Sequence, residues 1–168
     1  MTKALSDIIT DPHDFLESLF SKIESVGLKV DDFFLDHICY RVATEDEYQT
    51  KKIELLDHGD LLIESMVNGR MISTYKLHSP ILFNKRIIDV LELPAPKPGA
   101  KYMSGLEHVE FVTTEPLRNL VIRYPALKFE TYGIDKPINA DITLKFEGQC
   151  VRFHNQTLED VIAEEKLL

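Results

Sequence analysis

The spacing of apolar and polar positions divides the chain into helices and strands. Apolar side chains recur with the 3.6-residue period over 12–26, which predicts an amphipathic helix that packs on a sheet. Asp11 can cap this helix, and Gly27 can end it. Apolar runs typical of strands then follow at 35–42, 61–67, 70–77 and 87–93.

Local signals complete the first half of this pattern. Thr44 and Glu47 form a capping box, which predicts a helix to about Asp57 between the first two strands. Asn68-Gly69 is typical of a tight hairpin between the second and third strands, and a loop containing Pro80 is expected before the fourth. The predicted order is therefore strand, helix, strand, strand, strand.

The same order recurs after residues 94–105, a proline-rich stretch that predicts a stiff linker. A helix is expected from Thr114 to Arg123, and a terminal amphipathic helix at 157–167. The strands of this half are predicted at 106–113, 127–132, 138–146 and 149–154.

The first strands of the two halves also match in sequence. LDHICY at 35–40 aligns with LEHVEF at 106–111: both have Leu, an acid, His, a β-branched residue and, after one further position, an aromatic residue. A repeat of this kind indicates a duplicated module. We expect one α+β domain over 1–168, in which two βαβββ modules, about 35–93 and 106–156, form a curved mixed β-sheet cleft with an extra helix at each end.

The repeat also brings candidate metal ligands to equivalent positions. His37 and His108 lie in the two first strands, and Glu92 and His154 lie near the ends of the two last strands. Three imidazoles and a carboxylate suit a divalent transition metal. The simpler interpretation is that the histidines only form hydrogen bonds within the sheet and that Glu92 is exposed.

Strand alternation adds further candidates on the same faces. Arg41 shares the face of His37, where it can bind an anionic substrate group or pair with an acid. Glu110 shares the face of His108, where it can act as a general base or orient that histidine. Arg70 and Lys76 share a face of the strand after the hairpin, and they can bind a carboxylate or phosphate or simply form a cationic sheet edge.

Composition limits the classes of partner. The 168 residues carry 28 acidic and 19 basic side chains, a formal net charge of −9, which disfavours nucleic acids and anionic membranes. We find no apolar run of membrane-spanning length, no apolar signal-peptide core and no GxSxG or phosphate-binding glycine motif. We therefore expect a cytoplasmic protein, monomeric or dimeric, that binds a small molecule.

Several segments resemble the YecM family, which looks like a branch of the vicinal oxygen chelate superfamily. These segments are DHICYRV, VNGRMISTYKLHSPI, DVLELPAP, GLEHVEFV and VRFHNQTLEDVIAEE, and the resemblance covers roughly 10–168. It implies two βαβββ modules with metal ligands on the first and last strand of each, which are His37, Glu92, His108 and His154 here. The superfamily usually has glutamate at the last of these positions, so His154 is a departure.

The resemblance implies a divalent-metal-dependent isomerase, lyase or dioxygenase-like enzyme acting on a small molecule with adjacent oxygens. Four protein ligands leave room for a chelating substrate only on a five- or six-coordinate metal, which favours Fe, Mn, Ni or Co over tetrahedral Zn. Two alternatives remain open: a non-catalytic module that binds a small molecule in the same cleft, and a protein-interaction domain with a vestigial site.

Overall fold

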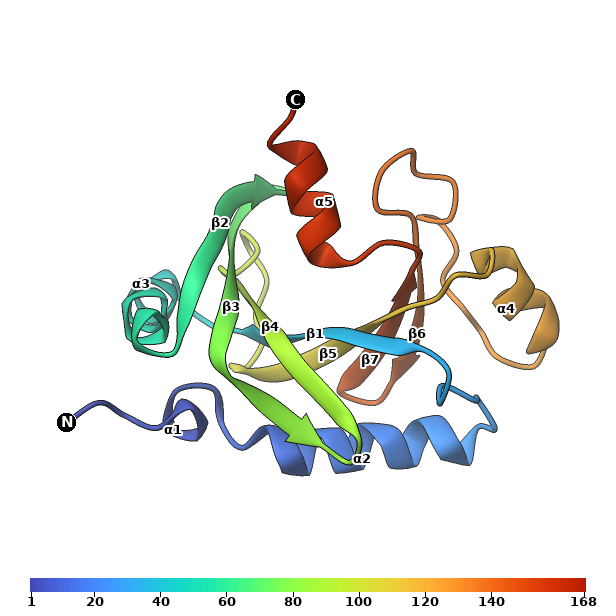
Figure 1. Cartoon of the computed structure of the whole chain (residues 1–168), viewed down its shortest axis with the longest axis horizontal. Helices are drawn as coiled ribbons and strands as arrows, with labels where there is room; N and C mark the ends of the chain where they lie inside the picture. Colours follow the sequence, from blue (N-terminus) through green and yellow to red (C-terminus); the bar gives the residue numbers. More distant parts are fainter. The chain divides into compact units, whose positions relative to one another are not determined.

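The computed structural model describes residues 1–168, and it divides into two compact units. The first comprises residues 1–15 and 37–107, and the second comprises residues 16–36 and 108–168. The chain forms five α-helices, one short 3-10 helix at Leu55–Asp57 and seven strands (Figure 1), which confirms the predicted α+β class. The helices are α1 Leu5–Ile9, α2 Pro12–Ser25, α3 Glu45–Glu54, α4 Leu117–Arg123 and α5 Leu158–Glu165. The strands are β1 Phe34–Arg41, β2 Gly59–Val67, β3 Arg70–Phe83, β4 Arg86–Pro94, β5 Gly105–Val112, β6 Asp141–Phe146 and β7 Gln149–His154.

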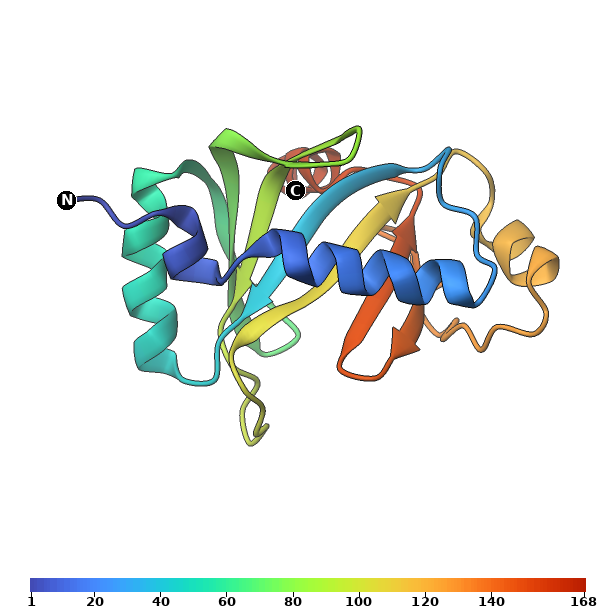
Figure 2. The ribbon, with the colours of Figure 1, turned by 90° about the horizontal axis from the view of Figure 1, so that it is seen from below.

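The strands of the first unit are hydrogen-bonded in the order β2-β3-β4-β1. β2, β3 and β4 pair antiparallel, and β1 pairs parallel with β4. Helix α3 follows β1 and is capped by Thr44, whose side chain accepts the Glu47 N–H, as the capping box predicted. α3 lies beside β2 (Figures 1 and 2) and buries Tyr48 against this sheet.

Strand β3 is longer than the sequence predicts. The expected loop containing Pro80 is wrong, because β3 continues to Phe83 before it turns into β4. The pairing of β3 with β4 is irregular between Lys76 and Ile81, and Pro80 lies within that interval. A proline, which has no N–H to donate, is tolerated where the ladder of hydrogen bonds is interrupted.

The strands of the second unit are hydrogen-bonded in the order β5-β7-β6. β5 pairs parallel with β7, and β6 pairs antiparallel with β7, so β5 and β7 repeat the parallel pair that β1 and β4 form in the first unit. An aromatic cluster forms the core of this unit: the Phe111 and Phe153 rings stack at 5.7 Å, and Phe20 of α2 meets Phe111 edge-on at 6.0 Å. Aromatic pairs in these geometries add stability beyond their buried area.

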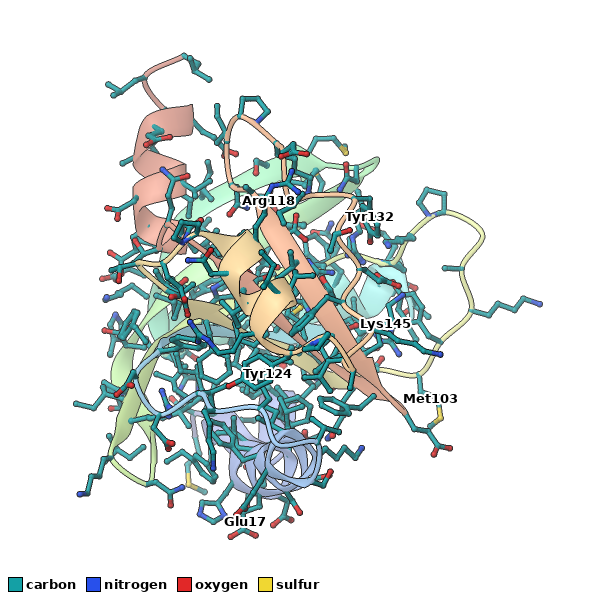
Figure 3. All side chains as sticks on the ribbon, turned by 90° about the vertical axis from the view of Figure 1, so that its right-hand side faces the viewer. Glu17, Met103, Arg118, Tyr124, Tyr132 and Lys145 are labelled. Atoms are coloured by element: carbon teal, nitrogen blue, oxygen red, sulfur yellow. The ribbon has the colours of Figure 1, made fainter.

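The strand expected over 127–132 is a second wrong prediction. Only Glu130 pairs there, in an isolated bridge with Thr143 of β6, and the segment up to β6 consists of turns. Pro125 and Gly133 bound this short run, and Tyr132 within it is exposed (labelled in Figure 3). A run with so little to bury does not support a full strand.

Other predicted elements correspond more closely to the structure. The linker expected at 94–105 coincides with the connection from the end of β4 at Pro94 to the start of β5 at Gly105. The terminal helix expected at 157–167 is α5, capped by Thr157, which accepts the Asp160 N–H. None of the helices is long and apolar enough to cross a membrane.

A buried hydrogen-bond network ties α3 to the sheet of the first unit. The Tyr48 hydroxyl lies 2.7 Å from both Glu64 Oε2 and Ser73 Oγ, and Lys52 Nζ forms an ion pair with Glu64 at 2.9 Å. Hydrogen bonds from Tyr48 and Lys52 lower the pKa of Glu64, and burial raises the pKa of Tyr48. The network therefore favours the ionised form of Glu64.

We predict that Tyr48→Phe destabilises the protein by about 1–3 kcal/mol at neutral pH, because it removes hydrogen bonds from a buried group. The pKa of Glu64 is lowered in the folded state, so its contribution is complete above the ordinary value of 4.5 and declines as the pH falls through the folded value. Urea unfolding of both proteins over a range of pH should show the difference shrinking in acid. A pH-independent difference would contradict this role for Glu64.

Candidate metal-binding residues

The first unit buries a histidine beside a carboxylate. In the β1–β4 pair, His37 lies opposite Val90 and Cys39 lies opposite Glu92, so alternation places His37 and Glu92 on one face of the sheet. The His37 Nε2 atom lies 3.7 Å from Glu92 Oε2. The His37 side chain is 2% exposed and that of Glu92 is 14% exposed, so Glu92 points inward rather than into solvent.

The second unit contains a more compact cluster on its parallel pair. His108 and Glu110 lie two residues apart on β5, and His154 lies at the end of β7. Glu110 Oε1 lies 3.2 Å from His108 Nε2, and Glu110 Oε2 lies 2.5 Å from His154 Nε2. All three residues are buried, and Arg152 Nη1 lies 3.6 Å from the same carboxylate. One buried carboxylate therefore lies between two imidazoles.

The donor chemistry of both groups fits a divalent metal. Ligands at about 2.1 Å from an ion lie roughly 3.0–3.4 Å from one another in octahedral or tetrahedral geometry. The His108–Glu110 separation falls in this range, and the His37–Glu92 separation is slightly longer. Neither ring nitrogen of His154 makes a hydrogen bond, although both are buried, and the short contact of Nε2 with Glu110 lacks hydrogen-bond geometry. Buried polar atoms without such a bond are uncommon and need an explanation, which an ion would supply.

The register of the second unit differs from the alignment that the sequence suggested. Glu92 lies two residues beyond the position paired with His37, whereas His154 lies four residues beyond Cys150, the position paired with His108. By register, Arg152 is the counterpart of Glu92, and His154 is one two-residue step further along its strand. Glu110 spans that step, because its carboxylate contacts both imidazoles.

The chain matches the family model described as YecM protein over residues 4–165. It is 31% identical over 157 residues to Protein YecM of Escherichia coli strain K12, which covers 92% of this chain and 81% of that protein. The chain belongs to the YecM family. It is also 34% identical over 89 residues to an uncharacterized protein of Haemophilus influenzae, which covers 53% of this chain and 47% of that protein.

Solved structures share the fold of this YecM-family chain. A structural genomics protein, EC4020, superposes with a TM-score of 0.76 at 24% identity and covers 90% of this chain and 87% of its own. A variant of Streptomyces coelicolor methylmalonyl-CoA epimerase, in complex with 2-nitronate-propionyl-CoA, superposes with a TM-score of 0.51 at 14% identity. The match covers 72% of this chain and 95% of the epimerase. The fold is therefore glyoxalase-like, as the resemblance to the vicinal oxygen chelate superfamily implied.

The three residues predicted to bind substrate lie in the first unit, in two different settings. The Arg41 guanidinium stacks on the ring of Tyr102, with Cζ 4.3 Å from the ring centroid. Arg70 Nη1 donates to the Tyr102 hydroxyl at 3.5 Å and to the Ala95 carbonyl oxygen at 3.4 Å. Lys76 forms an ion pair with Asp89 at 2.8 Å, so its charge is largely neutralised, and its role toward substrate stays a prediction.

Tyr102 contacts both Arg41 and Arg70, and nothing in the sequence indicates this. It lies in the connection between β4 and β5, where no periodic pattern marks a position as inward or outward. Its hydroxyl also accepts the Lys97 N–H at 3.1 Å. An isolated tyrosine in a lysine- and proline-rich linker gives no local signal for this role, since the partners that define it come from β1 and β3.

A cavity of about 500 Å³ lies in the second unit, and no histidine lines it. Its lining has both signs of charge, and Arg123 there is already paired with Glu115. The lining residues are Lys29, Asp31, Asp32, Phe33, Phe34, Val112, Thr113, Thr114, Glu115 and Arg123. None of them is a candidate metal ligand, so this cavity does not identify the site.

The contacts of Glu110 lead to a prediction that needs no substrate. Glu110→Gln removes the negative charge that lies between His108 and His154, so we expect the ring ¹⁵N chemical shifts of both histidines to change in NMR spectra recorded without metal. His58, whose Nε2 contacts the Lys3 carbonyl oxygen in the first unit, is the internal control and should not change. A change confined to His108 would contradict the contact with His154.

Proposed function

We propose that this YecM-family protein is a divalent-metal-dependent enzyme that acts on a small molecule with two adjacent oxygens. His37 and Glu92 are the proposed ligands in the first unit, and His108 and His154 are the proposed ligands in the second. The observation that supports this most is that each unit buries an imidazole beside a carboxylate on its parallel pair of strands. Burying such groups without a charged partner or ion is unfavourable, so a repeated arrangement of this kind favours a functional role.

The sequence repeat and the fold support metal ligands in both units. His37 and His108 occupy matching positions in LDHICY and LEHVEF, and the superfamily that the fold resembles takes its ligands from the first and last strands of both modules. Methylmalonyl-CoA epimerase is named for a reaction on a CoA ester, which is a small molecule with a carbonyl oxygen. For this chain we propose only the general class of reaction, one at an atom next to a carbonyl or hydroxyl oxygen of the substrate.

The donor set limits which metal is suitable. Imidazole and carboxylate ligands suit Fe, Mn, Ni, Co and Zn, and four protein ligands with open positions favour the ions that accept five or six ligands. When bound, such an ion would supply Lewis-acid stabilisation of negative charge on the substrate oxygens. The proposed ligand set contains no cysteine. It therefore differs from the structural zinc sites that cysteine thiolates hold.

Glu110 is the proposed proton-transfer residue. Its buried carboxylate contacts His108 and His154, and the Arg152 guanidinium lies 3.6 Å away. A carboxylate held among these groups can accept a proton from a substrate carbon or hydroxyl and return it without exchange with bulk water. Alternatively, Glu110 orients the two imidazoles through the same contacts. In that case, removing its carboxylate would weaken metal binding.

Metal titration of tag-free protein tests the proposed ligands. We predict that His37→Ala and His108→Ala each weaken Mn²⁺, Co²⁺ or Ni²⁺ binding by at least about 100-fold, which exceeds the roughly 10–100-fold expected for losing an outer partner. His78→Ala is the matched control, because His78 is an exposed histidine whose Nε2 lies 3.0 Å from Asp60 Oδ1, and this variant should bind like the wild type.

The pattern of losses distinguishes the possible outcomes. Weaker metal binding by variants in both units supports the proposed ligands of both. If His37→Ala abolishes binding while His108→Ala and His154→Ala bind as tightly as the wild type, the proposed ligands of the second unit are wrong. If no ion binds to the wild type, a metal-independent binding module becomes the better interpretation.

A further inference from the structure

Two arginines of the first unit differ from others in the chain in having no acidic partner. Arg118, Arg123 and Arg152 each lie within ion-pair distance of a carboxylate. Arg41 and Arg70 contact instead the ring of one tyrosine, its hydroxyl and one backbone carbonyl. In a chain with a formal net charge of −9, carboxylates are abundant, so two half-buried guanidiniums without one form an unusual local excess of positive charge.

Tyr102 places the two guanidinium groups against a single side chain. Its ring face holds Arg41, and its hydroxyl holds Arg70. A guanidinium stacked on a ring keeps its N–H groups at the edge, and Arg70 uses only Nη1 in its two long hydrogen bonds. Most of the ten N–H donors that two arginines carry therefore remain available to a ligand.

The strand register relates this pair to the proposed metal ligands of the same unit. His37, Cys39 and Arg41 alternate onto one face of β1, and Cys39 is level with Glu92. Arg41 is therefore one two-residue step, roughly 7 Å, beyond the level of Glu92. Arg70 is on β3, four residues before Thr74, which pairs with Glu92, so it lies on the same face and toward the same end of the sheet.

We propose that Arg41 and Arg70, positioned by Tyr102, form a binding site for an oxyanion group of the substrate. The oxyanion would be a carboxylate or a phosphate, both of which match the planar, forked donors of arginine. The inference rests on the proposed function, and it narrows the substrate to an anionic small molecule. In such a substrate, a few bonds would separate the chelating oxygens from the anionic group, because Arg41 lies one two-residue step beyond the level of Glu92.

Titration of metal-free protein with malonate and, separately, with inorganic phosphate tests the site without relying on the metal. The readout is the Nε–Hε NMR signals of the arginines. We expect saturable shifts of the Arg41 and Arg70 signals with dissociation constants in the millimolar range, and the tighter of the two anions identifies the class. Arg41→Gln and Arg70→Gln should each weaken binding at least about 10-fold, since each removes charged hydrogen bonds.

Matched variants separate a binding role from a structural one. Tyr102→Phe keeps the ring under Arg41 but loses the hydroxyl, so it should weaken binding less than Tyr102→Leu, which loses both. Arg118→Gln removes the same charge from an ion pair with Asp135 and should leave anion affinity unchanged. If Arg118→Gln weakens binding as much as Arg41→Gln, or if neither anion shifts the two arginine signals, the site is excluded.

The outcome for the anion site is distinguishable from that for the metal. If the proposed function is wrong, the wild-type protein takes up no metal. If the anion site is wrong, metal-free protein shows no shift of the Arg41 and Arg70 signals on addition of malonate or phosphate. With metal loaded, malate has adjacent hydroxyl and carboxylate oxygens and a second carboxylate, while lactate lacks the second carboxylate. Malate should bind at least about 10-fold more tightly than lactate, and Arg70→Gln should remove that preference. Equal affinities of wild-type protein for malate and lactate would contradict the proposal.

Discussion

Desolvation of ionisable side chains is the constraint on which the arrangement of both units depends. His37, His108, Glu110 and His154 are each at most 6% exposed, and Glu92 is mostly covered. An imidazole or carboxylate removed from water is unfavourable unless another charge, a hydrogen bond or a metal replaces the solvent. The carboxylate beside each histidine supplies part of that replacement, and a bound metal would supply the rest.

The parallel strand pairs make this arrangement possible. In each unit a strand from the start of the repeat pairs directly with a strand from its end, so side chains far apart in sequence share one face, as His37 does with Val90 and His108 with Cys150. The pairs are flanked by fully buried apolar residues, Ile38 and Leu91 in one unit and Val109 and Val151 in the other. This packing fixes the register, because a slip of one residue would move every ligand to the opposite face. The positions of the proposed ligands therefore depend on the same apolar burial that stabilises the sheet.

The sequence predicted the repeated elements well, because apolar periodicity and turn chemistry are local signals. The Thr44 cap, the Asn68-Gly69 turn and the Pro94–Gly105 connection all follow from neighbours in the chain. The continuation of β3 through Pro80 could not be predicted, because it depends on where its pairing with β4 becomes irregular. The missing strand near Glu130 shows the converse, since Phe129 packs against Phe153 but the segment forms only one bridge to β6.

The sequence predicted which histidines and carboxylates share a face of the sheet, but not the contacts that they make. Alternation placed Glu110 beside His108, but its simultaneous contact with His154 depends on the register of β5 with β7, which no short-range pattern encodes. Tyr102 was missed for the same reason, because its role is defined by Arg41 and Arg70 from distant strands.

The most direct test of the proposed ligands is a crystal structure of protein loaded with Mn²⁺ or Co²⁺, with anomalous scattering data collected at the metal edge. Anomalous density is expected within ligand distance, about 2.0–2.2 Å, of His37 and Glu92 and of His108 and His154. Loaded protein with no anomalous peak at these residues, or with peaks only elsewhere, would contradict the proposed ligands.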